Sequence, residues 1–294
     1  MSKAICFFHS ADLDGHCSGA IVKHEMGDAV ELRGINHGNP FPWDEVHGRD
    51  VIMVDFSLQP FSDMVLLHKV SSHLTWIDHH KSAIDDYNAY RQGSDERRFW
   101  DGKLEIGKGA CELTWEYYYP TWKENYMPGA VRLLSLYDVW KHDQDDDALP
   151  FQFGMRMFET YPTKPEAMEL WTDLFTKHAA PRDIISKGKT ILAYQDQQNE
   201  AYANSAAFET ELEGLKCIAI NKMLTNSQMF DSVWDENKYD AMLTFGYRDK
   251  KWTFSLYATK PSVDVSVVAK ARGGGGHAQA AGFQCISLPE GLLR

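Results

Sequence analysis

Cysteine is scarce in this sequence and never occurs in metal-binding or disulfide spacing. Five cysteines are scattered over 294 residues, and no pair has Cys-x-x-Cys spacing. An odd number of scattered cysteines argues against both a disulfide framework and a thiolate zinc site. We therefore expect buried or partly buried thiols in a reducing cytoplasm.

Basic residues are also few. The chain has 30 Lys and Arg residues against 42 Asp and Glu residues, which gives a formal net charge of −12. This sign excludes a protein that coats long nucleic acids through bulk positive charge. Phosphate chemistry is still compatible with it if divalent cations stand between the carboxylates and the substrate, because the cations invert the local field. Any contact with a nucleic acid must then be local.

Long apolar runs are absent. The apolar stretch at residues 4–8 is too short for a signal peptide, and no run approaches the length that spans a membrane. Hydrophobic residues nevertheless make up 44% of the chain, so a substantial core is expected, in one large domain or two ordinary ones. We expect a cytoplasmic protein with no membrane partner.

Short apolar runs alternate with helical periodicity in the first half of the chain. Residues 4–8, 51–54 and 74–77 have the composition of buried strands, and residues 15–26 and 60–70 have helical spacing. This alternation predicts an α/β fold with a mainly parallel sheet. Ligands of such sheets bind beyond the carboxyl ends of the strands.

The rest of the chain predicts helices and then a second strand-rich block. Helical segments are expected at 109–119, 127–140 and 164–206. Strands are expected at 215–221, 240–247 and 252–258, with a helix at 263–271. We expect an N-terminal domain over 1–190, which includes a helical connector, and a smaller C-terminal α/β domain over 205–294. The boundary should lie within 180–210.

Histidine and aspartate follow each of the three strands predicted in the first half. These residues are His9, Asp12 and Asp14 after the first strand, Asp55 after the second, and Asp78, His79 and His80 after the third. Taken singly, the aspartates could be helix caps or turn residues. Turns could equally use Gly, Asn or Ser, so the joint pattern indicates one shared site at the sheet edge.

The ligand types indicate the metal. Oxygen and imidazole ligands without thiolate favour Mn²⁺ or Mg²⁺ over structural zinc. Several carboxylates are needed to neutralise two divalent ions held close together, so we expect a dinuclear site. Two Mn²⁺ ions are the expected cofactors, with Mg²⁺ as the alternative.

These motifs resemble those of a known family. His-x-x-Asp-x-Asp, the Asp55 strand end, Asp78-His79-His80 and the Asp138 of Leu136-Tyr137-Asp138 are similar to motifs one to four of the DHH phosphoesterases. That family includes RecJ single-strand exonucleases, nanoRNase-type oligoribonucleases and manganese pyrophosphatases. Residues 273–277 resemble the glycine-rich signature of its C-terminal associated domain, so the resemblance covers nearly the whole chain and is weak in the middle. It implies a catalytic cleft between the two domains.

The resemblance also implies a role for each residue. It places His9 and Asp12 on one metal ion, Asp14, His79 and Asp138 on the other, and Asp55 between both. His80 would contact the scissile phosphate or protonate the leaving group, and Asp78 would orient a neighbouring histidine. An acidic run follows Asp138 and leaves four alternatives to it open, namely Asp143, Asp145, Asp146 and Asp147.

The glycine-rich segment suggests a phosphate cradle. Gly273, Gly274, Gly275 and Gly276 would let backbone N–H groups approach an anion, and we expect a helix N-terminus after them. Arg272 could fork onto a terminal phosphate and His277 could reach a phosphate or a base. A flexible loop is the alternative for this composition. If the cradle holds one substrate end while the metals hold the other, the two grips measure substrate length.

The resemblance implies a metal-dependent phosphodiesterase. Its substrates would be short RNA or DNA oligonucleotides or small nucleotides, hydrolysed to 5′-mononucleotides by a metal-activated water. A manganese pyrophosphatase is one alternative, although it should carry a basic anion trap in its second domain. A nucleotide-binding regulator without catalysis is the other, and it would have lost metal ligands. The sequence leaves base preference and direction of attack open, and a homodimer is among the oligomeric states it allows.

Overall fold

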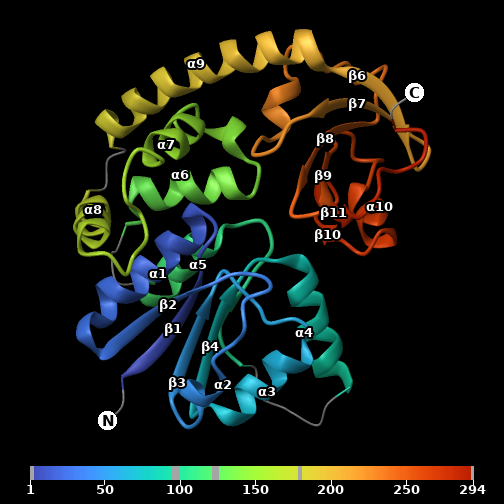
Figure 1. The fold of residues 1–294 in the computed structure, drawn as a ribbon. Coiled ribbons are helices and arrows are strands. Elements are labelled where there is room, and N and C mark those ends of the chain that lie inside the picture. The colour runs from blue at the N-terminus through green and yellow to red at the C-terminus, as the bar shows by residue number, and fades with distance from the viewer. Residues whose placement is uncertain (1–2, 94–99, 121–125, 178–180, 293–294) are drawn as a thin grey trace. The chain divides into compact units, whose positions relative to one another are not determined.

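The chain folds into two units, each built around its own β-sheet (Figure 1). The computed structural model describes residues 3–93, 100–120, 126–177 and 181–292. The first unit is Met1–Ile191 and the second is Leu192–Arg294. The predicted fold class, a parallel N-terminal sheet followed by a second α/β unit, is confirmed. Among the described residues, every helix is too short or too polar to cross a bilayer.

A five-stranded parallel sheet lies at the centre of the first unit, in the order β2-β1-β3-β4-β5. Its strands are β1 (Ala4–His9), β2 (Val30–Ile35), β3 (Asp50–Val54), β4 (His73–Asp78) and β5 (Asp101–Leu104). The sequence predicts β1, β3 and β4, and all three are confirmed. It does not predict β2 or β5, because polar and charged residues interrupt both.

Both faces of this sheet are buried. In β1, Ile5 and Phe7 point into one hydrophobic cluster, while Cys6 and Phe8 point into another. The helices that contribute to these clusters are α1 (Leu13–Met26), α2 (Trp43–Val46), α3 (Ser62–Val70), α4 (Lys81–Gly93) and α5 (Ala110–Tyr118). Burial on both sides explains why the central strands are continuous apolar runs rather than alternating ones.

The order of the strands creates a binding position at the carboxyl edge of the sheet. β1 and β3 are neighbours, and the connection that leaves β1 runs to β2 on one side, whereas the connection that leaves β3 runs to β4 on the other. The carboxyl ends of β1 and β3 therefore flank a topological switch point, where open α/β sheets bind their ligands. His9 ends β1 and Asp55 directly follows β3.

A helical layer completes the first unit. Its helices are α6 (Gly129–Asp138), α7 (Ala148–Met155), α8 (Pro165–Thr176) and the first part of the long α9 (Arg182–Ala206), which continues into the second unit. Two glycines let α7 and the start of α9 approach closely. A Cβ atom on Gly154 would lie 2.1 Å from the carbonyl oxygen of Ile184, and one on Gly188 would lie 1.6 Å from that of Pro150. Neither position has room for a side chain.

The second unit contains a six-stranded mixed sheet in the order β10-β11-β9-β8-β7-β6. Its strands are β6 (Phe208–Leu212), β7 (Leu215–Asn221), β8 (Ala241–Arg248), β9 (Lys251–Tyr257), β10 (Gly275–Gly276) and β11 (Ala280–Cys285). Among the described strands of this second sheet, β7 and β8 pair in parallel and all other neighbours are antiparallel. The expected strands match β7, β8 and β9, and the expected last helix matches α10 (Val265–Ala271).

The close approach of α7 and α9 leads to a stability prediction. We expect Gly188→Ala to lower the free energy of unfolding by at least about 2 kcal/mol, because the new methyl group would overlap backbone atoms that cannot move independently. Gly93→Ala is the control, since a Cβ there meets no atom within 4 Å. It should change stability by less than about 1 kcal/mol. Urea unfolding measures both, and equal effects would contradict the packing.

Candidate metal centre

His9, Asp12 and Asp55 come together at the carboxyl ends of β1 and β3. The Nδ1 atom of His9 lies 2.8 Å from Asp12 Oδ2 and 3.5 Å from Asp55 Oδ2. Asp12 also caps α1, because its other oxygen accepts a 2.9 Å hydrogen bond from the backbone N–H of Gly15. One carboxylate oxygen thus caps the helix while the other faces the imidazole.

A second group combines His79 with Asp14 on α1 and Asp138 at the end of α6. The Nε2 atom of His79 lies 3.3 Å from Asp138 Oδ2 and 3.7 Å from Asp14 Oδ2. Asp55 reaches this group too, since its Oδ1 atom lies 3.3 Å from the same nitrogen. In each of the two groups the potential ligand atoms lie within 4.8 Å of one another, and Asp55 stands between them.

The backbone holds Asp55 in an unusual conformation. Its φ angle is 55°, in the left-handed region that non-glycine residues rarely occupy. Aspartate tolerates this region better than most residues, and its N–H donates a 2.9 Å hydrogen bond to the carbonyl of Ile77 on the neighbouring strand. The sharp turn directs the carboxylate at the two histidines that follow β4, and backbone strain of this kind is concentrated at functional sites.

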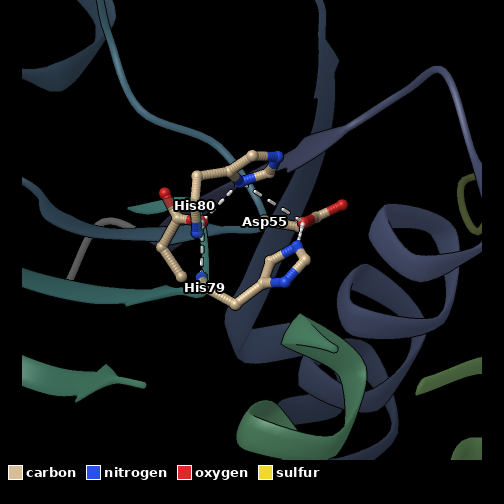
Figure 2. Close-up of side chains that lie close together, drawn as sticks. Asp55, His79 and His80 are labelled. Carbon is tan, nitrogen blue, oxygen red and sulfur yellow. Dashed lines mark hydrogen bonds and ion pairs between the residues drawn. The ribbon is translucent and has the colours of Figure 1, made fainter. Parts of the chain in front are cut away.

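Asp78 fixes two consecutive histidines. Its Oδ1 atom accepts hydrogen bonds from the backbone N–H groups of His79, at 2.7 Å, and His80, at 3.1 Å. The same oxygen lies 2.7 Å from Nδ1 of the His80 ring. Both imidazoles consequently face the carboxylate of Asp55 (Figure 2). This is the geometry of a carboxylate that orients its neighbours.

The buried carboxylate of Asp14 rests on the start of α5. Its two oxygens accept hydrogen bonds from the backbone N–H groups of Ala110, at 2.7 Å, and Cys111, at 2.8 Å. The positive end of the helix dipole also stabilises a negative charge at this position. These contacts offset the cost of removing the carboxylate from water, so Asp14 can remain an anion inside the protein.

A second polar link joins α5 to α6. The hydroxyl of Ser135 accepts a 2.9 Å hydrogen bond from the N–H of Gly109 and lies 2.5 Å from Glu112 Oε2, to which it donates. Asp138 lies one helical turn beyond Ser135, so the link connects the helix that supports Asp14 with the helix that carries Asp138. Ser135 and Glu112 belong to no motif and could not be recognised from the sequence.

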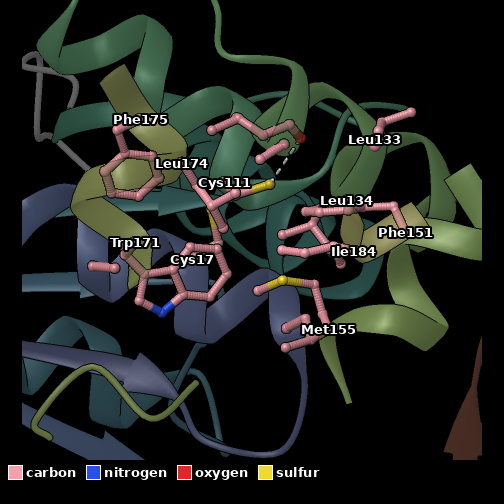
Figure 3. Packing of buried hydrophobic residues seen from close by; sticks show 14 of the residues in the cluster. Cys17, Cys111, Leu133, Leu134, Phe151, Met155, Trp171, Leu174, Phe175 and Ile184 are labelled. Atoms are coloured by element: carbon pink, nitrogen blue, oxygen red, sulfur yellow. Dashed lines mark hydrogen bonds between the residues drawn. The ribbon is translucent and has the colours of Figure 1, made fainter. Parts of the chain in front are cut away.

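Apolar packing holds the same helices together. Cys17 of α1, Cys111 of α5 and Leu134 of α6 belong to one buried cluster (Figure 3). All five cysteines are free thiols, four of them buried and Cys285 partly buried, which confirms the expectation for this residue type. The ligand-bearing helices are therefore fixed by a close-packed interior as well as by hydrogen bonds.

The histidines carry raised pKa values. Burial alone would lower the pKa of His9, but Asp12 and Asp55 outweigh it and raise the value to about 11. In the same way, burial is outweighed at His79, where the carboxylates of Asp55, Asp138 and Asp14 raise the pKa to about 10. The carboxylates around each imidazole thus stabilise its protonated form more strongly than burial destabilises it.

The carboxylates divide into two kinds. Burial raises the pKa of Asp14 to about 6, and the charge of Asp55 adds to this effect. Burial and the charge of Asp14 raise the pKa of Asp138 well above its usual range. Asp55 is the exception, because its contacts with His79 and His9 outweigh burial and lower its pKa. Of Asp14, Asp55 and Asp138, Asp55 is thus the one whose ionised form the surroundings favour.

The site has the charge and spacing that divalent cations require. Five aspartates and three histidines make up the candidate groups, so a negative excess remains even when every imidazole is protonated. Asp55 Oδ1 is buried and has no hydrogen-bond partner among the described residues. Ligands about 2.1 Å from an octahedral ion stand about 3 Å apart. The contacts of 3.3 Å around Asp55 and His79 fit that arrangement, so the residues fit a hard divalent cation.

Two of the alternatives to Asp138 have other partners. Asp145 forms an ion pair with Arg132, and Asp147 lies 3.0 Å from the ammonium group of Lys189. Within the acidic end of α6 and the run that follows it, Asp138 is the residue brought to His79.

The structure adds His37 to the surroundings of the site. Its ring centroid lies 5.9 Å from that of His9 and 4.9 Å from that of Phe56. His37 follows β2, which ends at Ile35, and so stands at a fourth strand end on the same sheet edge. The period-two alternation of residues 30–35 was the signal that could have revealed this strand.

The glycine-rich segment differs from its prediction. A helix N-terminus was expected after the glycines, and this is wrong: α10 precedes them, and they lead into a hairpin in which β10 pairs with β11. A Cβ on Gly274 would lie 2.1 Å from the carbonyl oxygen of Gly282, and one on Gly276 would lie 2.6 Å from that of Ala280. Close backbone pairing therefore requires these glycines. A helix C-terminus also lacks the positive dipole that favours anions.

Arg272 and His277 flank this hairpin. The guanidinium group of Arg272 pairs with the carboxylate of Glu213 and lies 5.3 Å from the ring centroid of Phe283. The backbone N–H of His277 donates a 2.8 Å hydrogen bond to the carbonyl of Ala280, which closes the turn. Arg272 is thus already engaged by one carboxylate.

Comparison with known proteins shows a distant sequence relative. No protein-family profile matches the chain. A curated relative, an uncharacterized protein of Acanthamoeba polyphaga mimivirus, is 26% identical over 255 residues, which cover 82% of this chain and 54% of that protein. The chain thus spans about half the length of this relative.

Two solved structures resemble the whole chain. One is a DHH domain described as belonging to a family of ribosomal proteins, with a TM-score of 0.55 and 13% identity over 95% of this chain and 82% of that one. The other is an exopolyphosphatase-related protein from Bacteroides fragilis, with a TM-score of 0.52 and 14% identity over 98% of this chain and 88% of that one. The chain has the fold of the DHH-domain proteins, as its motifs predict.

The raised pKa values lead to a prediction about pH. Without metal, the folded state holds protons on His9 and His79 that the unfolded chain releases near pH 6.5. The stability that these protons contribute is complete below that pH and is lost as the pH rises towards about 10, the pKa of His79. We expect the unfolding free energy of chelator-treated protein to fall between pH 6.5 and 8.5.

The same measurement in excess Mn²⁺ provides the comparison with the chelator-treated protein. Bound cations need neutral imidazoles, so excess Mn²⁺ should abolish or reverse the decline. The double variant His9→Asn with His79→Asn should also lack it, because the titrating groups are gone. Urea unfolding followed by tryptophan fluorescence measures the slope. An identical decline with and without Mn²⁺ would show that the imidazoles are not involved.

Proposed function

Because the chain has the DHH-domain fold, we propose that it is a metal-dependent phosphodiesterase that acts on short oligonucleotides or small nucleotides. The observation that carries this proposal is the sharing of Asp55 between two groups of ligand atoms. A carboxylate shared in this way is the hallmark of a centre that holds two divalent ions close together. An ion pair with a purely structural role needs only one acidic and one basic group. Each of the two candidate ligand groups instead brings three potential ligand atoms within a few ångströms of one another.

In this proposal His9, Asp12 and Asp55 hold one ion, and Asp55 joins a further three residues around the other. Those three are Asp14, His79 and Asp138. Mn²⁺ or Mg²⁺ suits the oxygen and imidazole donors. When bound, the ions lower the pKa of a water molecule and clamp the phosphoryl oxygens. Asp14 has both oxygens engaged by N–H groups of α5, so it contributes a lone pair from an already fixed position.

His80 is the residue that we propose for the leaving group. Asp78 holds its Nδ1 atom at 2.7 Å, which stabilises the protonated ring and directs Nε2 away from the carboxylate. A protonated imidazole in this position can contact the phosphate or deliver a proton to the leaving oxygen. Asp78 itself is buried and acts through His80 rather than on the substrate.

We propose that the second unit also takes part in substrate binding, with Arg272 on a terminal phosphate and His277 beside it. Gly274, Gly275 and Gly276 would serve this site by forming the hairpin between those two residues. The ion pair with Glu213 means that a phosphate must displace a carboxylate to reach the guanidinium group. Binding of a terminal phosphate favours short substrates, and the net charge of −12 disfavours long polyanions.

A substrate panel tests the proposed function. Purified protein is assayed with Mn²⁺ on RNA and DNA of 2 to 24 nucleotides, on cyclic nucleotides and on pyrophosphate. We expect the highest kcat/KM on the shortest oligonucleotides, with 5′-mononucleotides as products. Turnover of pyrophosphate alone would instead support the pyrophosphatase, and nucleotide binding without any turnover would support a regulator.

Asp55 should be indispensable for turnover. We expect Asp55→Asn to lower kcat by roughly 1000-fold or more, because the amide cannot neutralise either ion. Asp50→Asn is the matched control, since Asp50 begins the same strand at the opposite edge of the sheet and is exposed. Metal analysis after gel filtration should show ions lost from Asp55→Asn alone. Near-normal activity of that variant would overturn the assignment of the centre.

Arg272 and Glu213 should affect substrate capture in opposite directions. Arg272→Ala should raise KM for a dinucleotide about tenfold with a smaller loss of kcat, and His277→Ala should act in the same sense. Glu213→Gln should lower KM, because the phosphate no longer competes with a carboxylate. His80→Ala should instead lower kcat. If none of the three substitutions around the hairpin changes KM, the glycine-rich segment has only a structural role.

A further inference from the structure

Trp140 occupies a backbone position that usually belongs to glycine. Helix α6 ends with the paired hydrogen bonds of a Schellman motif, from Trp140 N–H to Tyr137 O at 3.1 Å and from Lys141 N–H to Leu136 O at 2.8 Å. In this motif Trp140 has a φ angle of 59°. Glycine suits that left-handed conformation, whereas a bulky residue in it is an outlier. The indole is therefore retained at a conformational cost.

The indole is also exposed, and its residue closely follows a candidate metal ligand in the chain. Trp140 is 49% exposed, although large aromatic side chains are usually buried. It follows Asp138 by two residues, which span at most about 7 Å of chain. One nucleotide is long enough to span this distance between a candidate metal ligand and an aromatic residue.

A loop at the sheet edge brings a second apolar side chain to this region. The ammonium group of Lys141 donates a 2.7 Å hydrogen bond to the carbonyl of Gly107, in the loop that follows β5. Ile106, next to Gly107, is 54% exposed. The hydrogen bond between Lys141 and Gly107 thus joins two segments that adjoin the carboxyl edge of the sheet. Each segment carries one exposed apolar side chain, Trp140 in the first and Ile106 in the second.

His142 adds a polar group. Its ring centroid lies 6.2 Å from that of Trp140. Its Nδ1 atom is buried and has no hydrogen-bond partner among the described residues. A buried polar atom without a partner costs stability. If the His142 side chain turns outward, a ligand that presents a complementary group can supply the missing partner.

We propose that Trp140 and His142 form a nucleobase subsite beside the metal centre, in which a base stacks on the indole and its edge hydrogen-bonds to His142. A flat, exposed aromatic ring suits a base, because every base has a π-face. This inference rests on the proposed function, and it narrows the substrate class to phosphodiesters that carry a base next to the scissile phosphate. Inorganic pyrophosphate has no group for such a subsite.

Replacement by glycine separates a ligand role from a structural one. Trp140→Gly removes the ring and also relieves the left-handed backbone, so the variant should unfold at the same temperature as the parent protein or a higher one. Trp140→Ala removes the ring but keeps the strain, and Trp140→Phe keeps an aromatic face. Leu224→Gly is the matched control, because Leu224 also has a positive φ, of 54°, and is fully exposed in the second unit.

The kinetic test compares a dinucleotide with the same dinucleotide in which the bases are replaced by abasic tetrahydrofuran residues. Stacking of one base is worth a factor of about 5 to 150 in affinity. The ratio of kcat/KM for the two substrates should therefore fall by about tenfold or more in Trp140→Gly and Trp140→Ala. Trp140→Phe should keep most of the preference, and Leu224→Gly all of it. Equal losses on both substrates, or no loss, would overturn the subsite.

A binding measurement keeps this test independent of turnover. Calorimetry in the presence of Mn²⁺ compares the affinity for a nucleoside 5′-monophosphate with that for inorganic phosphate. Trp140→Gly should weaken the first relative to the second by about tenfold or more. If the parent protein shows this preference but hydrolyses nothing, the proposed function fails while the subsite stands. If hydrolysis is present and the binding ratio is unchanged in Trp140→Gly, the subsite is wrong.

Discussion

The repulsion between buried carboxylates is the constraint on which the rest of the structure depends. Asp14, Asp55 and Asp78 are all buried, and Asp12 and Asp138 adjoin them. Charges a few ångströms apart in a protein interior repel far more strongly than they would in water. A fold that brings such groups together must supply compensating donors and hold the backbone rigidly, or the carboxylates would protonate or move apart.

Each carboxylate meets this constraint in its own way. Asp14 receives two N–H groups from the start of α5, Asp78 receives two from its own turn, and Asp55 lies among imidazoles. Fixed dipoles of this kind cost no reorganisation when a cation arrives. The buried cluster between the helices gives the rigidity, because close-packed side chains cannot shift without opening a cavity. The apolar core and the polar site are thus parts of one arrangement.

The sequence predicts the elements that are buried on both faces and the polar residues that follow them. β1, β3 and β4 were identifiable because they are continuous apolar runs, and His9, Asp55 and His79 follow from their ends. β2 was not predicted because charged residues alternate with its apolar ones. His37, which follows β2, was therefore not recognised as a residue near the site. Ser135 and Glu112 act through hydrogen bonds set by helix packing, which local sequence patterns do not encode. The helix N-terminus expected after the glycine run is wrong, because glycine serves tight strand pairing as readily as a helix start.

The separation of the ligands along the chain has a consequence for how the protein folds. Potential ligands begin at His9 and end at Asp138, and the sheet, α1, α5 and α6 all stand between or around them. Contacts between residues so far apart in sequence form only after the chain between them has lost much of its conformational entropy. No early folding intermediate built from local contacts can therefore present the full set of donors. In the proposed metal centre, ion binding would therefore belong to the last stage of folding, and a nascent chain would not sequester metal before its tertiary structure is complete.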